Sequence, residues 1–474
     1  MSLNQLTITQ AHNGLKKKEF SSVELTEAVL SQIKERDKQI HAYLTLTEEL
    51  ALSQAKRVDK KIANREEIGS LAGVPVAIKD LILVEGVRCT AGSKILAEYI
   101  APYDATAVKK LRQAGAIIIG KTNLDEFGMG SSTENSAYGA TKNPHDLERV
   151  PGGSSGGSAA ALAADECIYA LGTDTGGSIR QPASFCGVFG LKPTYGRISR
   201  YGLIAFASSL DQIGPMTKTA EDAWLVLKVI AGQDKMDSTS SNPPGRATKN
   251  KFQIKDLKIG LPKEYFVKGL DPEVEKTVKK AVSQYEKMGA QVIEINLPFS
   301  EYALPAYYII QPAEASANLA RYDGIKYGLS EPASQLLDVY LKTRQRGFGD
   351  EVRRRIMLGA YTLSAGYYEA YYLKAQKVRA LIKEDFAKAF EKADVLMGPV
   401  SPVPAFRLGE KIDDPVSMYL SDIYTAAINL AGLPAVSLPC GRINNLPVGL
   451  QIIGRHFEEE KIIQTAQAYE NISA

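Results

Sequence analysis

Two short segments rich in glycine and serine contain the residues best suited to chemistry. Residues 152–158 read Gly-Gly-Ser-Ser-Gly-Gly-Ser, and residues 173–180 read Thr-Asp-Thr-Gly-Gly-Ser-Ile-Arg. Glycine accepts positive φ and lets the main chain approach a ligand, so several N–H groups can point at one oxygen. Such donors stabilise the oxyanion of an acyl-transfer reaction. Ser154 and Ser178 are therefore the candidate catalytic serines.

The alternative for the first segment is a flexible linker or an ordinary loop. Two apolar runs adjoin this segment on its C-terminal side, an alanine-rich run at 159–164 and a second run at 167–171. This setting favours a place inside the fold over a linker.

A serine hydroxyl is a weak nucleophile and needs a base within hydrogen-bond reach. His145 is the nearest histidine, but it follows an Asn-Pro turn signal and is more typical of a solvated loop. Lys79 is the better candidate because it ends the apolar run 74–78, which predicts a buried strand. Burial lowers the pKa of a lysine towards neutrality. The alternative is a structural lysine that pairs with an aspartate.

The segments around Lys79, Ser154 and Ser178 resemble the Ser-Ser-Lys triad of the amidase signature family. The resemblance implies that Ser178 attacks a carboxamide, that Ser154 relays its proton, and that Lys79 is the general base. It also implies an oxyanion hole made by four main-chain N–H groups, those of Thr175, Gly176, Gly177 and Ser178.

Further segments are similar to one branch of this family, the glutaminase subunits of tRNA-dependent amidotransferases. They are residues 125–134, 189–197, 209–215 and 314–324, and the resemblance covers nearly the whole chain. It implies that the chain hydrolyses glutamine through an acyl-enzyme on Ser178 and supplies ammonia for converting Glu-tRNA(Gln) to Gln-tRNA(Gln). The alternative is a free-standing amidase that acts on another carboxamide, against which residues 314–324 argue.

The resemblance further implies a heterotrimer. A kinase/transamidase partner subunit is expected to use ATP and Mg²⁺ and to hold most of the tRNA, and a small third subunit is expected beside it. The chain has no G-x-x-x-x-G-K-[ST] loop and no strand followed by G-x-G-x-x-G, so a nucleotide-binding module is the weaker alternative. We expect no cofactor in this chain.

Free glutamine presents an α-carboxylate, which calls for a cation, and an α-ammonium group, which calls for a carboxylate. By resemblance these residues are Arg355 and Asp422, and Tyr308 and Gly130 are further substrate-binding residues, with Tyr307 as the alternative tyrosine. The arginine triplet 353–355 is also compatible with a solvated helix face or with an inward-facing Arg354. Asp422 is also compatible with a helix cap.

The four cysteines show no CxxC spacing and no partner histidines, so we expect no metal site. Cys186 alone suggests a different nucleophile, that of a Cys-Glu-Lys amidase similar to nitrilases.

Alternating strand and helix patterns predict an α/β amidase-signature fold, with a mixed, largely parallel central sheet and helices on both faces. The predicted strands are residues 74–79, 116–121, 168–172, 257–261, 291–295, 395–397 and 435–438. The predicted helices include residues 21–37, 47–63, 105–114, 219–231 and 272–288. A capping box of Ser21 and Glu24 opens the first helix, and Asp271 caps the last.

We expect residues 1–474 to form a single domain. The polar, proline-containing segment 233–255 is compatible with a linker. Because the implied catalytic residues precede it and the implied substrate residues follow it, we interpret it as an exposed loop. Residues 300–390 lack strand patterns and are expected to form helices that cover the site.

The composition fits a water-soluble enzyme. A net charge of +3 on 474 residues does not predict a nucleic-acid surface. No apolar run approaches the roughly 20 residues of a membrane-spanning helix, and the N-terminus lacks a signal-peptide pattern. We therefore expect a cytoplasmic protein without a membrane partner; the alternative is an organelle, after removal of a transit peptide.

Overall fold

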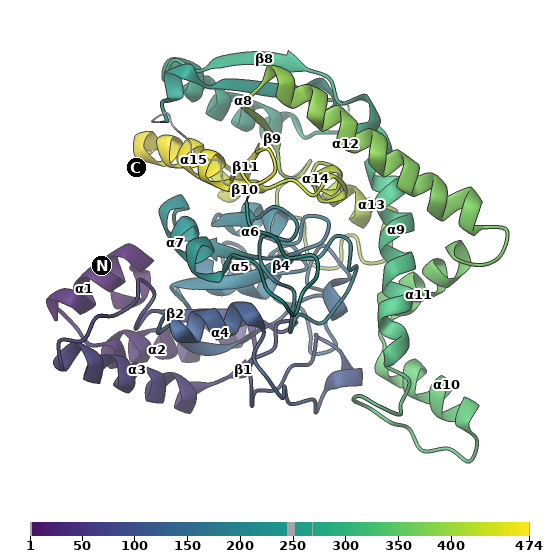
Figure 1. Cartoon of the computed structure of the whole chain (residues 1–474), viewed down its shortest axis with the longest axis horizontal. Coiled ribbons are helices and arrows are strands. Elements are labelled where there is room, and N and C mark those ends of the chain that lie inside the picture. Colours follow the sequence, from purple (N-terminus) through teal and green to yellow (C-terminus); the bar gives the residue numbers. More distant parts are fainter. Residues whose placement is uncertain (1, 244–251, 268, 474) are drawn as a thin grey trace.

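A mixed sheet of eleven strands forms the centre of the computed structural model, which describes residues 2–243, 252–267 and 269–473. In Figure 1 the sheet runs from the N-terminal elements at the bottom to β8 at the top. In spatial order the strands are β1 (Tyr43–Leu46), β3 (Ile117–Thr122), β2 (Pro75–Lys79), β4 (Tyr169–Asp174), β6 (Gln212–Thr217), β5 (Phe189–Lys192), β10 (Ala435–Ile443), β11 (Leu446–Ile453), β9 (Val395–Pro399), β7 (Lys258–Pro262) and β8 (Gln291–Ile295).

The predicted mixed sheet is confirmed, but the prediction that it is largely parallel is wrong. The sheet is parallel in two blocks, β3-β2-β4 and β9-β7-β8. The other six pairings within the described residues are antiparallel. Each of these six includes β1, β5, β6 or β11, the strands that the sequence pattern did not predict. These strands are short, or they contain glycine and proline, which weaken a strand pattern.

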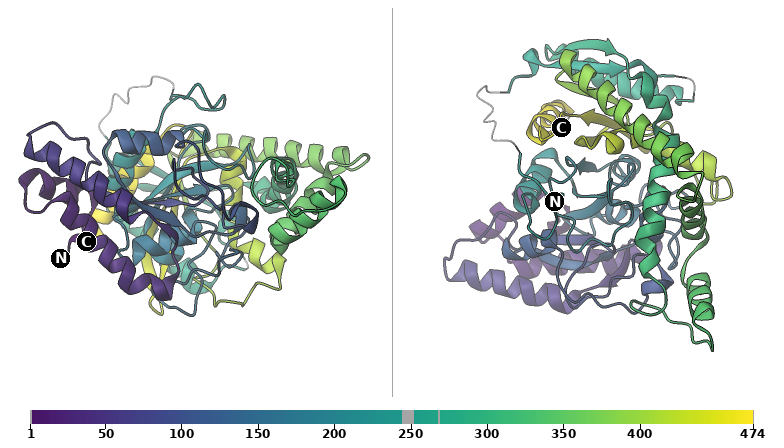
Figure 2. Two further views of the ribbon diagram at one scale, coloured as in Figure 1. Left: turned by 90° about the horizontal axis from the view of Figure 1, so that it is seen from below. Right: turned by 45° about the vertical axis from the view of Figure 1, so that its right-hand side comes forward.

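Helices pack on both faces of the sheet (Figure 1, Figure 2). On the N-terminal half, α2 and α5 pack against β2 and β3, and α7 packs against β5 and β6. The helices α4 and α15 pack against α7. The helices of the first half are α1 (Ile8–Lys17), α2 (Ser22–Ile40), α3 (Glu48–Ala63), α4 (Thr106–Gln113), α5 (Gly156–Ala163), α6 (Arg180–Cys186) and α7 (Ala220–Ile230). Those of the second half are α8 (Pro272–Lys287), α9 (Ala303–Asn318), α10 (Leu336–Gly347), α11 (Asp350–Thr362), α12 (Lys374–Lys392), α13 (Pro415–Tyr419), α14 (Ala426–Ala431) and α15 (Glu459–Ser473).

The predicted helix caps are confirmed. The side chain of Ser21 accepts a hydrogen bond from the N–H of Glu24, and the Glu24 side chain accepts from the N–H of Ser21, which makes the capping box. Asp271 caps α8, and Pro272 occupies the first position of that helix.

Strands on both sides of the segment 233–255 belong to the same sheet, because β6 precedes it and β7 follows it. Part of that segment, 244–251, lies outside the described residues. The region 300–390 contains α9, α10, α11, most of α12 and a π-helical stretch (Tyr368–Leu373), which lie together along one side of the molecule (Figure 1). In the described ranges, no helix is both long and apolar enough to cross a bilayer.

A close contact between α9 and α11 depends on Gly359. A Cβ atom at this position would overlap the main-chain oxygen of Pro312, which lies inside α9. Because α11 carries Arg355, this contact also sets how near the arginine lies to the core.

We expect Gly359→Ala to lower the free energy of unfolding by about 2 kcal/mol, the scale on which an added methyl group strains a packed core. Urea denaturation measures this change. Met357→Ala is the control, since this side chain on the same helix is 72% exposed and its loss should change the free energy by less than about 0.5 kcal/mol. Equal stability of the two variants would contradict the packing argument.

Candidate active site

Lys79 lies at the end of β2 and is fully buried. Its Nζ atom is 2.8 Å from each of three hydroxyl oxygens, those of Ser154, Ser155 and Thr173. Because β2 and β4 are parallel neighbours, Lys79 and Thr173 reach the same edge of the sheet. Burial lowers the pKa of Lys79 to about 7, against the opposite pull of three nearby carboxylates, Asp125, Asp174 and Asp211.

The hydroxyl groups around Lys79 suit a neutral amine. Ser155 Oγ donates to the main-chain oxygen of Thr173 at 3.0 Å, so it can only accept from Nζ. A neutral amine has two N–H donors and one lone pair. It can therefore donate to Ser155 and Thr173 and accept the proton of the Ser154 hydroxyl.

The alternative of a lysine paired with an aspartate applies to a different residue. Asp80 Oδ1 lies 2.7 Å from Lys121 Nζ, and both side chains are fully buried. Among the described residues, no carboxylate lies within ion-pair distance of Lys79.

Ser178 lies in the turn between β4 and α6, which Asp174 organises. One oxygen of the Asp174 carboxylate accepts from the N–H of Gly177 at 2.9 Å, and the other accepts from the N–H of Ile179 at 3.1 Å. Arg180 donates to both oxygens at 3.0 Å. Burial would raise the pKa of Asp174, but Arg180, together with Lys192 and Asn429, lowers it to about 2. The ion pair is therefore charged and fixes the turn.

The two glycine-rich segments lie side by side. The N–H of Ser155 donates to the main-chain oxygen of Ser178 at 3.1 Å. The peptide bond between Gly153 and Ser154 is cis. Ser154 is 1% exposed and Ser178 is 8% exposed, so Ser178 is the more accessible hydroxyl. The structure thus brings Lys79, Ser154 and Ser178 into one cluster.

The expected oxyanion hole needs one correction. The N–H of Gly177 is directed at the Asp174 carboxylate and is therefore a structural donor. Gly177 has a φ of +144°, which favours glycine. Thr175, Gly176 and Ser178 stay as the predicted donors.

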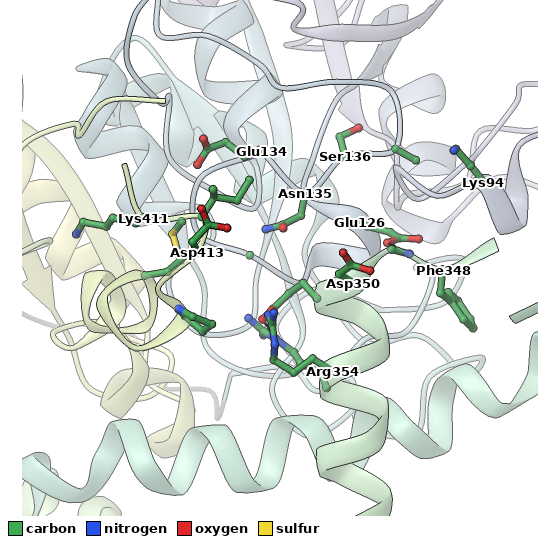
Figure 3. A pocket seen from close by; sticks show the side chains of 18 of the residues that line it. Lys94, Glu126, Glu134, Asn135, Ser136, Phe348, Asp350, Arg354, Lys411 and Asp413 are labelled. Carbon is green, nitrogen blue, oxygen red and sulfur yellow. Dashed lines mark hydrogen bonds and ion pairs between the residues drawn. The ribbon is translucent and has the colours of Figure 1, made fainter. Parts of the chain in front are cut away.

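The structure contains a cavity of about 480 Å³ (Figure 3), and the residues that line it do not include Lys79, Ser154 or Ser178. Its wall is formed by residues 346–355 around the start of α11, by residues 126–137, and by residues 411–419. Gly130 and Arg355, both predicted to bind substrate, are part of this wall.

Of the two candidate arginines, Arg355 faces inward. It is 3% exposed, whereas the side chain of Arg354 is 48% exposed. Arg355 donates from Nε to Glu351 at 2.7 Å and from Nη1 to Gln311 at 2.9 Å. Its guanidinium also lies 5.2 Å from the ring centre of Tyr308, which stacks on Tyr419.

Asp422 lies close to the catalytic turn. A Cβ atom added to Gly177 would be 3.2 Å from Asp422 Oδ1. Its Oδ2 accepts from Ser131 Oγ at 2.5 Å, whereas Oδ1 has no hydrogen-bond partner within the described part of the chain. Burial raises the pKa of Asp422 to about 7. A buried oxygen without a partner, so placed, is suited to accept a proton of a bound cation.

The model of the Amidase family matches residues 24–463. The chain belongs to the amidase family. It is 58% identical over 472 residues to a protein from Moorella thermoacetica that is named as a subunit of glutamyl-tRNA(Gln) amidotransferase, over 99% of this chain and 97% of that protein. A protein of the same name from Microcystis aeruginosa is 58% identical over 467 residues, with 98% and 97% covered.

Solved structures of family members superpose on the chain. The crystal structure of the same glutamyl-tRNA(Gln) amidotransferase subunit from Thermotoga maritima is 44% identical, with a TM-score of 0.82 over 99% of this chain and 95% of that one. The native peptide amidase from Stenotrophomonas maltophilia is 30% identical, with a TM-score of 0.81 over 98% and 96%. The amidase-signature fold predicted from the sequence is therefore confirmed.

The two alternative catalytic groups lie together, outside the serine cluster. Cys186 is buried, and burial raises the pKa of its thiol far above neutrality, which leaves it unreactive. His145 Nε2 lies 2.9 Å from the main-chain oxygen of Cys186. Neither arrangement is that of a nucleophile with its base. In the described residues, no group of histidine, cysteine, aspartate and glutamate side chains could hold a metal ion.

Several residues that contact Lys79 or Arg355 were not predicted from the sequence. Ser155 and Thr173 adjoin the two motifs, and their hydroxyl groups at the end of a strand were an available signal. Gln311 and Tyr419 come from distant helical segments and carry no sequence signal of their own.

Proposed function

We propose that the chain is the glutaminase subunit of a tRNA-dependent amidotransferase. The observation that carries this proposal is a lysine without an ion pair, hydrogen-bonded to Ser154. A buried arginine in the cavity wall and the buried carboxylate of Asp422 near the catalytic turn support it. The cluster supplies amide hydrolysis, and these two charges match those of an amino acid. The names of the relatives from Moorella thermoacetica and Thermotoga maritima support the same function.

In the proposed reaction, Ser178 Oγ attacks the side-chain carboxamide carbon of glutamine. Its proton passes to Ser154, and the Ser154 proton passes to the neutral Lys79. The N–H groups of Thr175, Gly176 and Ser178 stabilise the oxyanion. The protonated lysine then returns a proton through Ser154 to the departing nitrogen, so that ammonia leaves and a γ-glutamyl ester remains on Ser178. Water hydrolyses this ester by the same proton path.

Arg355 and Asp422 are proposed to bind the two charged groups of the substrate. Arg355 faces the α-carboxylate, with Tyr308 beneath its guanidinium. The unpartnered Oδ1 of Asp422 faces the α-ammonium group. Gly130 also lines the cavity, and a Cβ atom at this position would overlap the side chain of Asp125.

We expect Asp422→Asn to raise the KM for glutamine about 30-fold, with a smaller effect on kcat, because the loss of a buried charge-assisted hydrogen bond costs about 2 kcal/mol. Steady-state ammonia release measures both constants. Asp413→Asn, an exposed carboxylate at the rim of the same cavity, is the matched control. Similar constants for the two variants would contradict the assignment of Asp422.

The proposed partners follow from the branch of the family. We propose that the ammonia passes to a kinase/transamidase subunit, which uses ATP and Mg²⁺ and holds most of the Glu-tRNA(Gln), and that a small third subunit completes a heterotrimer. The names of the relatives, each of which is called a subunit, support the existence of partner chains.

The function is tested by ammonia release from glutamine, from asparagine and from an uncharged carboxamide, with the chain alone and with its partner subunits. We expect glutamine to give the highest kcat/KM. A higher kcat/KM for the uncharged carboxamide would instead support a free-standing amidase.

A further inference from the structure

We propose that Glu126 is a positioning residue for Arg355 and acts through the N-terminus of α11. This inference rests on the proposed function, because it concerns the binding of the α-carboxylate of glutamine. Glu126 belongs to a different part of the chain from α11, and it lies in the wall of the same cavity as Arg355.

The Glu126 carboxylate holds the connection between α10 and α11. Glu126 is 2% exposed. Its Oε2 accepts from the N–H of Gly349 at 2.8 Å, and its Oε1 accepts from Ser93 Oγ. Ser93 Oγ also lies 3.2 Å from the main-chain oxygen of Gly347, but its single proton serves one acceptor at a time. The three-residue connection 347–349 is thus bound at Gly349 and lies against Ser93 at Gly347.

These contacts distinguish a positioning role from a direct role in binding. Both carboxylate oxygens of Glu126 already accept hydrogen bonds from the protein. Figure 3 shows Glu126 beside Phe348 and Asp350 at the start of α11, with Glu134 and Lys411 farther along the cavity wall. Its oxygens therefore serve the helix rather than a ligand.

The start of α11 gains a hydrogen-bond acceptor from Glu126, in addition to the acidic residues Asp350 and Glu351 of its own first turn. Gly349 is the N-cap residue and has no side chain that could accept the free N–H groups of the first turn. A carboxylate at this end of a helix is favourable for the helix dipole. The contact also requires glycine, since a Cβ atom at residue 349 would lie 2.5 Å from Glu126 Oε2.

Aromatic packing makes the contact between Glu126 and the start of α11, called the anchor below, more rigid. Phe127 adopts a φ of +52° and packs against Tyr322 and Phe348, with ring centres 5.1 Å and 5.8 Å away. Arg355 follows Gly349 by six residues, about 9 Å along the helix axis. A rotation of the first turn therefore moves the guanidinium that faces the substrate.

The test compares Glu126→Ala, Glu126→Gln and the control Glu134→Ala. Glu134 lines the same cavity and accepts a main-chain N–H from Gly409 at 2.7 Å, but within the described residues no hydrogen bond or ion pair joins it to α11. We expect Glu126→Ala to raise the KM for glutamine about tenfold, or about 1.4 kcal/mol of binding, with kcat changed less than about threefold. Glu134→Ala should change KM less than about twofold.

Glu126→Gln should restore the native KM to within about twofold. Its amide oxygen can still accept from Gly349, and its amide NH₂ can donate to Ser93 Oγ. Because the anchor acts through Arg355, Glu126→Ala should add little in an Arg355→Lys background. It should also leave the KM for an uncharged carboxamide unchanged.

Hydrogen exchange gives a readout that does not depend on glutamine hydrolysis. We expect the amides of residues 349–352 to exchange at least tenfold faster in Glu126→Ala than in the native chain. Native exchange rates and a native KM in this variant would overturn the proposal, as would an equal loss with the uncharged carboxamide. If Glu126→Ala does not fold, Ser93→Ala removes one of the two donors, and an unchanged KM there would also overturn it. A native chain that releases no ammonia from glutamine, alone or with its partner subunits, would instead contradict the proposed function. The exchange rates would still show whether Glu126 holds the start of α11.

Discussion

Ser178→Ala is expected to lower kcat for ammonia release from glutamine by at least about 10⁴-fold, as the loss of a nucleophile does in other serine hydrolases. Without Oγ, no acyl-enzyme can form. The turn itself should persist, because the Asp174 carboxylate holds it by accepting from two main-chain N–H groups and from the Arg180 guanidinium, and not through the serine side chain. Binding of glutamine is therefore expected to survive the substitution.

The measurement is ammonia release together with the intact mass of rapidly quenched protein. The native chain should carry a γ-glutamyl adduct during turnover, and Ser178→Ala should carry none. Ser136→Ala is the matched control, because Ser136 lines the cavity away from the catalytic turn and its loss should change the rate less than about threefold. A Ser178→Ala variant with native activity, or a Cys186→Ala variant without activity, would reject the nucleophile.

The parts of the fold that local patterns predicted are the parallel blocks. β2, β3 and β4 contain continuous apolar runs, as expected for strands buried on both faces. β5 has only four residues, and β6 contains Gly214 and Pro215, so neither gives a clear strand pattern. Their pairing with β4 and β10 is a property of the tertiary fold, and it is what makes the centre of the sheet antiparallel.

The candidate site also consists of residues that short motifs predict and of contacts that only the tertiary fold determines. The two serines and Lys79 stand in short motifs whose composition already indicates acyl transfer. The N–H of Gly177 is bound by the Asp174 carboxylate, a contact that the motif does not specify. Tyr419 meets Tyr308 only because α9 and α13 converge on Arg355. Such long-range contacts were beyond prediction from residue types and spacing.

Lys79→Met is expected to lower kcat by about 10³-fold or more, the scale of general-base and proton-relay losses. Methionine fills a similar volume but cannot accept a proton from Ser154. Lys79→Arg should be equally inactive at every pH, because a guanidinium is always protonated. Circular dichroism checks that both variants fold, and a variant that keeps the native rate would exclude Lys79 as the base.

The activity of the native chain should fall as the pH is lowered through about 7, the pKa that burial gives Lys79. The protonated amine cannot accept a proton, so kcat/KM should drop about tenfold for each further pH unit. Asp422, whose pKa is also raised to about 7, must be ionised to bind an α-ammonium group and would produce a similar fall. An uncharged carboxamide separates the two, because only the Lys79 effect applies to it. A flat profile with this substrate would contradict a titrating lysine.

The pH dependence of the free energy of unfolding tests independently whether Lys79 is neutral in the folded chain. The pKa of Lys79 is about 7 in the folded chain, whereas a lysine in the unfolded chain has a pKa of about 10.4. Between these values the unfolded chain binds more protons than the folded chain, so this site raises the free energy of unfolding as the pH rises. The stability of the native chain relative to Lys79→Met should therefore increase from about pH 7 to about pH 10 and level off outside this window. A difference that does not change with pH would mean that Lys79 stays charged in the folded state and cannot serve as the base.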